Sequence, residues 1–489
     1  MKKNMIFLFL VLVFTSCSDF LSESSQDEVR LSQVSDIEEL LLGEGYKPNA
    51  FYSTEIYTDE LQSNGVTDNA YQSEQDRNRF YYKWDKKMFT DEEGGGGNEY
   101  WYEPYNCILG CNIVLDYIGK VGGDDNLREN IHGEALTLRS WYYLHLVNLF
   151  GVAYNQSDPS KELGVPLKLT SEVSIEYMKR NTVKEVYDQI EKDLLEGYEL
   201  LKEHKVTRNF YRINHLAAGA ILSRLYLYKQ DWDNAIKYAD EVLKEKSNLL
   251  NLNSTNTEIG NAQSFYTVYS IDSPDEIIWG RLNKINHTHV QYGFKPPFTI
   301  SEKMPYDGSY SDFSDDGLAD LRAVYYFNWE SIFNQTTYQS DYYAYYASKG
   351  KQDDGGFQGI RTAELYLNRA EAYAQKYKRD GNIQNLDAAL LDLNKLRSYR
   401  YSQDRFNKLT SSNFKDADDL LTFCINERFR ELCGETNNRW CDLRRYGLLV
   451  THEFNDEGAV TKYTNNMGKY VLPIPQVALD VNKALIQNQ

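Results

Sequence analysis

Two adjacent stretches of helical periodicity joined by a short turn constrain the fold of this chain more than any other feature. Residues 213–229 and 233–246 are the expected helices, and residues 230–232 are the turn between them. Small and aromatic side chains match the roughly 34-residue tetratricopeptide pattern at Ser223, Tyr226, Ala235 and Ala239. Because such a hairpin buries its apolar face only against a neighbour, the sequence predicts a scaffold of packed helical repeats.

Further helical hairpins are expected on both sides of this one. They pair residues 127–150 with a helix after residue 182, residues 361–373 with 386–396, and residues 419–432 with a stretch that resumes at residue 439. Thr182 and Glu185 have the spacing of a capping box, which marks the start of a helix. The expected fold is therefore mainly α, a tetratricopeptide-like hairpin scaffold with irregular aromatic-rich loops and short β-hairpins.

Two segments lack helical periodicity and are rich in Gly, Pro, Ser, Asp and aromatic residues. They span residues 51–102 and about 251–354, and the second contains strand-like runs at 265–271 and 276–279. Loops carried by a rigid scaffold are where binding residues usually lie. We therefore expect the ligand site in these two segments.

Aromatic side chains of these segments are the candidate ligand-binding residues. The chain has 40 Tyr and 7 Trp against 7 His, and Tyr and Trp present flat apolar faces with a polar edge, which suit sugar rings. The candidates are Trp84, Trp101, Tyr102, Tyr292, Tyr306, Tyr310 and Trp329. For Trp101, core packing against the following helix is the competing interpretation. The sequence does not tell which candidates share one face.

The N-terminus has the pattern of a lipoprotein signal. Lys2 and Lys3 precede a short apolar run, and small residues lead to Cys17. The run is about half of the roughly 20 residues that span a bilayer, so residues 1–16 are interpreted as a signal peptide. Cys17 is the expected lipidation site, and an ordinary signal with an incidental cysteine is the alternative. The acidic residues that follow favour a tether at the cell surface.

Charge and cysteine content exclude several classes of protein. The net charge of −19 argues against a nucleic-acid partner, because phosphates require clustered Lys and Arg. The spacings of the remaining cysteines match neither a disulfide framework nor a zinc site. They are expected to be buried apolar residues, with one bridge among Cys424, Cys433 and Cys441 as the alternative.

No metal ion or other cofactor is predicted. Asp312 to Gly317 resembles the start of a calcium loop, but Ala323 occupies the position of the closing bidentate glutamate. His287 and His289 have the spacing of metal ligands without a third histidine nearby, and are interpreted as part of a solvated loop. Whether calcium binds remains open from the sequence.

Acidic and basic side chains alternate near the last hairpin, at Arg428, Glu431, Glu435, Arg439, Asp442 and Arg444. They are interpreted as a buried ion network that fixes this hairpin. Glu427 and Glu431 have the spacing of a glycosidase carboxylate pair on one helix face. The interleaved arginines would keep both carboxylates ionised, which argues against a general acid and against an enzyme.

The chain resembles the SusD/RagB family of surface lipoproteins in short motifs spread over nearly its full length. The motifs are residues 17–21, Trp101 with Tyr105, Ile108 and Asn112, residues 134–151, 164–166, Arg180 with 182–183, residues 320–322, 361–364 and 369–373, Glu427 to Glu435, residues 439–447, 472–475 and 487–488. No single motif is decisive, but their shared order along the chain is.

This resemblance implies a non-catalytic protein that captures oligosaccharides at the outer surface of a Gram-negative bacterium. It implies a SusD-like α/α fold, anchoring in the outer membrane through lipid, and a SusC-like TonB-dependent outer-membrane transporter as partner. Binding of peptides, as in some members, is the alternative, and a surface glycosidase is a more distant one. The matching motifs belong to the scaffold, so the ligand stays open.

The expected organisation is one compact structural unit after the signal peptide at residues 1–16. Residues 17–250 form a SusD-like N-terminal region with helical hairpins. Residues 251–489 form a C-terminal region that is loop-rich over 251–354, helical over 355–450 and a tail over 451–489.

Overall fold

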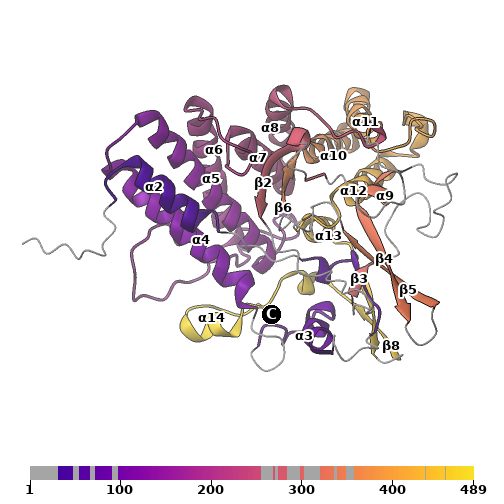
Figure 1. The fold of residues 1–489 in the computed structure, drawn as a ribbon, viewed down its shortest axis with the longest axis horizontal. Helices are drawn as coiled ribbons and strands as arrows, with labels where there is room; N and C mark the ends of the chain where they lie inside the picture. The colour runs from indigo at the N-terminus through magenta and orange to yellow at the C-terminus, as the bar shows by residue number, and fades with distance from the viewer. Residues whose placement is uncertain are drawn as a thin grey trace, which may run out of the picture.

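Helical hairpins form the frame of the protein (Figure 1). The computed structural model describes residues 31–47, 54–65, 72–90, 97–254, 268–269, 274–282, 298–301, 320–334, 339–347, 357–435, 437–456 and 459–488. The three central hairpins are α5 (Asp125–Phe150) with α6 (Val183–Glu203), α7 (His215–Lys229) with α8 (Trp232–Glu245), and α10 (Thr362–Asp380) with α11 (Ile383–Arg397). The expectation of a mainly α hairpin scaffold is confirmed.

Side-chain caps fix where these helices begin. The expected capping box is present, since Thr182 N–H donates to Glu185 at 2.8 Å and Glu185 N–H donates back to the Thr182 hydroxyl at 3.2 Å. Asp231 caps α8 by accepting from Asn234 N–H, so Trp232 begins this helix instead of ending the turn. Gly381, with φ of +67°, ends α10 well beyond the predicted residue 373.

The helices stand side by side in a row, in which α5, α6, α7, α8, α10 and α11 follow one another (Figure 1). Small residues allow close approach where α5 meets α6. A Cβ at Gly197 would lie 2.6 Å from the Thr137 hydroxyl oxygen and 3.0 Å from the Gly133 carbonyl oxygen. A larger side chain there would therefore push the two helices apart.

The row is completed by α12 (Ala417–Leu432) and α13 (Asn438–Tyr446), which form the expected last hairpin. Shorter helical elements connect the frame: α2 (Val34–Leu40), η1 (Leu41–Gly45), η2 (Glu55–Tyr57), η4 (Ile118–Lys120), η5 (Leu252–Ser254), η6 (Pro274–Glu276), α9 (Arg322–Tyr325), η8 (Ser411–Asn413), η9 (Met467–Tyr470) and α14 (Gln476–Val481). No helix in the described part of the chain is both long and apolar enough to cross a bilayer.

The segment expected to be loop-like at residues 51–102 contains two helices. They are α3 (Gln72–Tyr82) and α4 (Asn98–Tyr117). The helix α4 contains Pro104 beyond its first turn, where the missing N–H removes one hydrogen bond within the helix, to the Tyr100 carbonyl. Trp101 and Tyr102 therefore lie on a helix, and their expected placement in a loop is wrong.

Strands pair in four antiparallel two-stranded sheets within the described residues. These are β1 (Leu61–Ser63) with β3 (Phe298–Ile300), β2 (Ile277–Leu282) with β6 (Phe357–Arg361), β4 (Phe327–Asn334) with β5 (Gln339–Ala347), and β7 (Thr451–Asp456) with β8 (Ala459–Thr464). The predicted strand run at 276–279 corresponds to β2, whereas 265–267 and 270–271 of the other run lie outside the described residues. The β4–β5 hairpin extends from the end of the molecule opposite α2 (Figure 1).

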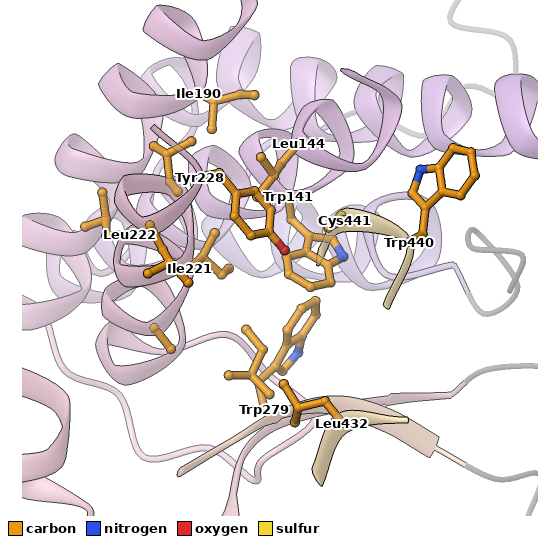
Figure 2. Packing of buried hydrophobic residues seen from close by; sticks show 14 of the residues in the cluster. Trp141, Leu144, Ile190, Ile221, Leu222, Tyr228, Trp279, Leu432, Trp440 and Cys441 are labelled. Carbon is orange, nitrogen blue, oxygen red and sulfur yellow. The ribbon is translucent and has the colours of Figure 1, made fainter. Parts of the chain in front are cut away.

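One buried cluster of apolar side chains extends from Val34 to Ile474. At its centre, Trp141 of α5 and Trp279 of β2 meet edge to face with ring centroids 5.2 Å apart (Figure 2). Trp440 donates its indole N–H to the Asn148 carbonyl at 2.8 Å. The cysteines at positions 107, 111, 424, 433 and 441 are buried and free, so the alternative of a bridge among the last three is excluded.

Candidate ligand-binding site

A pocket of about 400 Å³ opens between the end of η1, the segment before α7, and strand β2. We call it the Tyr46–Arg281 pocket. Its lining consists mainly of aromatic rings, cationic side chains and one side-chain amide, together with a leucine and a glycine: Leu42, Tyr46, Lys47, Tyr142, Arg208, Asn209, Tyr211, Arg212, Trp279, Gly280 and Arg281. Its volume falls within the roughly 300–1,000 Å³ of small-molecule sites.

Hydrogen bonds to the helical frame hold the walls of the pocket. The Tyr46 hydroxyl donates to Glu134 at 2.5 Å and accepts from Ile213 N–H at 3.0 Å. The Tyr142 hydroxyl donates to the Gly45 carbonyl at 2.6 Å. Both rings are thus fixed to neighbouring segments, so the pocket is formed before any ligand arrives.

The floor of the pocket is joined to the hydrophobic core. Trp279, which is buried, donates its indole N–H to the Tyr211 carbonyl at 3.2 Å and lies against Trp141 (Figure 2). Tyr211 is half-buried and packs on Phe210 with ring centroids 4.4 Å apart. Asn209 beside it is exposed. The pocket therefore combines a rigid aromatic floor with polar groups at its rim.

A buried ion pair supports the pocket from below. Arg212 makes two hydrogen bonds of 2.8 Å with the Glu134 carboxylate and one of 3.0 Å with Glu38. Burial lowers the pKa of Arg212, but the hydrogen bonds and charge of Glu134 outweigh burial and raise it overall. The guanidinium therefore stays charged and is held in a fixed position.

Arg281 brings a further cation to the pocket from strand β2. Its Nη2 donates to the Lys47 carbonyl at 3.5 Å. Burial lowers the pKa of Arg281, while the Tyr142 hydroxyl and the Cys107 thiol raise it. An aromatic floor with guanidinium and amide donors at the rim suits a polyhydroxylated ring that has one apolar face.

The candidates from the sequence do not gather at one place. Trp84 is only 3% exposed, donates its indole N–H to the Tyr57 carbonyl at 3.1 Å, and stacks on His452 with ring centroids 4.1 Å apart. Its ring faces are thus used in the core, so the interpretation of Trp84 as an open stacking surface is not supported. Trp329 lies on β4. The structure does not describe the side chain of Trp329. The other candidates, Cys17, Tyr292, Tyr306 and Tyr310, lie outside the described residues altogether.

Trp101 and Tyr102 line a second depression of about 640 Å³, which we call the α4–α14 groove. Trp101 is only 9% exposed and packs edge to face on Phe150 at 4.9 Å, so core packing is its main role. Tyr102 is 61% exposed. The other lining residues are Tyr105, Pro166, Lys168, Ser174, Ile175, Glu176, Tyr177, Met178, Val477, Ala478, Val481, Asn482 and Leu485.

The α4–α14 groove is surrounded by exposed apolar side chains. Val173 and Ile175 are each 98% exposed, and Val481 is 72% exposed. Contiguous apolar surface of this kind is typical of contacts with another macromolecule. The groove therefore differs from the Tyr46–Arg281 pocket in the exposed apolar side chains at its edge and in having fewer cationic side chains in its lining.

The residues of the Tyr46–Arg281 pocket were missed from the sequence. Tyr46 follows a helix, Tyr211 precedes one, and Trp279 lies on a strand, so no local pattern connects them. The usable signal was the run Trp279-Gly280-Arg281, an aromatic and a cation at the end of the predicted strand run 276–279. Among the described residues, no group of His, Cys, Asp and Glu is arranged to hold a metal ion.

The expected ion network is present, and it is larger than predicted. Glu431 contacts Arg322, Arg361 and Arg400 at 2.8 to 3.1 Å. Burial raises the pKa of Glu431, but these three charges outweigh it and hold the pKa well below its usual range. Glu427, beside Arg322 at 2.9 Å, also has a lowered pKa. Both carboxylates are thus ionised, buried and unsuited to proton donation.

One residue of the predicted network, Arg444, does not pair with a carboxylate. Arg428 pairs with Asp442 at 2.9 Å, and Arg439 pairs with Asp59 at 2.6 Å. The guanidinium of Arg444 instead donates to the backbone carbonyls of Asn148 and Gly151 at the end of α5. Arg444 therefore caps a helix instead of pairing with a carboxylate.

Two family profiles match the chain. Residues 19–227 match a profile described as "Starch-binding associating with outer membrane", and residues 316–489 match one described as "SusD family". The "SusD-like protein P2" of Formosa agariphila is 23% identical over 431 residues, which cover 81% of each chain.

Solved structures share this fold. A SusD-like carbohydrate binding protein from Bacteroides vulgatus has a TM-score of 0.68 and 22% identity, covering 93% of this chain and 97% of that one. A SusD superfamily protein from Bacteroides thetaiotaomicron has a TM-score of 0.67 and 20% identity, covering 94% of this chain and 100% of that one. At these identities the likeness concerns the fold.

Proposed function

Because this chain belongs to the SusD/RagB family, we propose that it is a surface lipoprotein that binds oligosaccharides and passes them to a TonB-dependent transporter of the outer membrane. The observation that carries the proposal is the Tyr46–Arg281 pocket, which is lined by both aromatic rings and hydrogen-bond donors. A structural relative from Bacteroides vulgatus is described as carbohydrate binding, which supports the same ligand class here.

The pocket offers what a sugar ring needs. The half-buried ring of Tyr211 provides an apolar face for the C–H groups of a pyranose. Asn209 and Arg208 at the rim provide donors for ring hydroxyls. Because the pocket walls are held by the frame, little ordering cost is expected on binding.

Anchoring and the transporter partner are parts of the same proposal. Cys17 is the proposed lipidation site. The exposed apolar side chains around the α4–α14 groove, Val173 and Ile175 among them, are the proposed contact surface for the transporter. Replacing both by Asp should prevent co-purification of the transporter from mildly solubilised membranes without lowering sugar affinity. Unchanged co-purification would refute this assignment.

The proposed role is binding without catalysis. The pair of carboxylates with the spacing considered for a glycosidase, Glu427 and Glu431, is buried and paired with arginine, which supports this view. Peptide binding at the same pocket is the alternative. A calorimetric panel of oligosaccharides and short peptides decides between them, and analysis of the mixture for hydrolysis products tests for a glycosidase.

Two matched variants test the site. Tyr211→Ala should lower oligosaccharide affinity about tenfold, because a stacking face is lost. Tyr102→Ala, which removes an exposed tyrosine in the other groove, should leave the affinity within twofold. If Tyr102→Ala abolishes binding and Tyr211→Ala does not, the ligand site is the α4–α14 groove.

A further inference from the structure

The segment that joins α5 to α6 carries two aliphatic side chains that lie almost entirely in solvent. Val173 and Ile175 are each 98% exposed, more than any other large apolar side chain of the described residues. They belong to residues 171–178, which we call the 171–178 loop. Two such side chains at one loop tip, beside the apolar edge of the α4–α14 groove, are typical of a contact with another macromolecule.

Hydrogen bonds to the frame hold the 171–178 loop at both ends. Ser171 donates its backbone N–H and its hydroxyl to the Asp116 carboxylate, each at 2.7 Å. At the other end, the Met178 carbonyl accepts from the side-chain amide of Asn482 at 2.8 Å. Because both ends are fixed before binding, a partner that contacts the tip loses little free energy to ordering the loop.

The tip of the loop is acidic as well as apolar. Glu172 and Glu176 are exposed and stand on either side of the two aliphatic side chains in the sequence. Neither carboxylate forms an ion pair with another described residue. The nearest cations in the sequence, Lys168 and Lys179, lie outside the loop, and Lys168 donates to the Glu172 backbone carbonyl. The tip therefore presents two aliphatic side chains between two carboxylates.

Charge separates the candidate occupants of this tip. A second copy has the same net charge of −19 and would bring its own two carboxylates against these. Residues 18–30, which follow Cys17, contain four carboxylates and one arginine. A lipid surface presents anionic phosphates. Since each of these repels the two carboxylates, a protein surface with cationic groups is the complementary occupant.

We propose that the 171–178 loop enters an apolar cavity on the transporter, and that the rim of this cavity carries Lys or Arg. This inference rests on the proposed function and names the kind of surface that the transporter offers. The two aliphatic side chains fill the cavity and slow dissociation. The two carboxylates meet the cations of the rim and speed association.

A photoreactive benzoylphenylalanine in place of Ile175 tests the contact in cells that express the full-length lipoprotein and its transporter. Irradiation should join the protein to an outer-membrane barrel protein, with Lys or Arg beside the attachment point in the crosslinked peptide. The same group in place of Leu391 is the control. Leu391 is 69% exposed on α11, at the other end of the row of helices (Figure 1), and should give no such product. A crosslink from position 175 to a second copy, to lipid or to residues 18–30 overturns the proposal.

Binding rates to the transporter, co-purified in mild detergent, separate the two parts of the contact. Val173→Ser combined with Ile175→Ser should raise the dissociation rate constant about 100-fold or more, because two aliphatic side chains no longer lose water on binding. Glu172→Gln combined with Glu176→Gln should lower the association rate constant about 3- to 10-fold at low salt and leave it unchanged at high salt. Asp387→Asn, which removes an exposed carboxylate from α11, should change neither rate.

Each outcome decides. If the wild-type protein binds the transporter and both loop variants bind it with unchanged rates, the loop is not the contact, and the proposed function stands. Faster association of the Gln variant at low salt overturns the cationic rim. If the wild-type protein binds no transporter at all, the proposed partner fails together with this inference.

Discussion

Replacing Glu431 by Gln tests the buried ion network around α12. Glu431 is fully buried and accepts hydrogen bonds from Arg322, Arg361, Arg400 and the Tyr326 hydroxyl. It joins α12 to the segments that carry these partners. Loss of its charge therefore affects four elements at once.

The expected loss follows from what each arginine retains. Arg322 keeps Asp320 and Glu427, and Arg361 keeps Glu276 and Glu435. Arg400 keeps Glu276 and the Leu250 carbonyl, and its Nε loses its contact with both oxygens of Glu431. Breaking a buried pair costs about 3–5 kcal/mol, and because Gln keeps an acceptor oxygen we expect a loss of about 3 kcal/mol.

Equilibrium unfolding in urea, followed by tryptophan fluorescence, measures this loss. Asp188→Asn is the matched control, because its partner Lys184 at 2.5 Å and Asp188 are both about half exposed. An exposed pair contributes less than about 1 kcal/mol. The control should therefore unfold at nearly the urea concentration of the wild-type protein.

The pH dependence provides a second check with a definite sign. The folded pKa of Glu431 is depressed, so its stabilising effect is present above the unfolded pKa of about 4.3 and disappears as pH falls towards the folded value. The difference between wild type and Glu431→Gln should be constant from pH 5 to 7 and shrink below pH 4. Equal unfolding midpoints at pH 7 would refute the reasoning.

Three further changes have definite expected results. Burial, together with the charge of Glu55, raises the pKa of Glu60 to about 8. The stability of the wild-type protein should therefore fall as pH rises from about 4 to 8. Glu60→Gln should remove much of this pH dependence, as measured by urea unfolding. Cys17→Ala should abolish incorporation of labelled palmitate and association with the membrane fraction. Trp84→Ala should lower the unfolding free energy by about 3–5 kcal/mol and leave sugar affinity unchanged, and the reverse pattern would make Trp84 a binding residue.

The helical frame was predictable because its signals are local. The capping residues Thr182 and Glu185 and the repeat positions near Ala235 lie within a few residues of what they determine. The start of α4 was obscured, since a run of glycines precedes it and Pro104 lies inside it. The helical spacing of Trp101, Tyr105 and Ile108 was the remaining sequence signal for α4.

The pocket could not be predicted in the same way. Tyr46, Tyr211 and Arg281 come from three distant segments that meet only after α5, α7 and β2 have packed. Trp84 looked like a loop residue, but its left-handed backbone, with φ of +50°, turns it onto His452 in the core. Aromatic composition indicated the ligand class, whereas tertiary packing decides which rings face solvent.

A crystal structure of the protein with a bound oligosaccharide tests the central claim most directly. We expect electron density for a sugar ring in the Tyr46–Arg281 pocket, stacked on Tyr211 and within hydrogen-bonding distance of Asn209 or Arg208. A sugar bound in the α4–α14 groove against Tyr102, with the Tyr46–Arg281 pocket empty, would contradict the account.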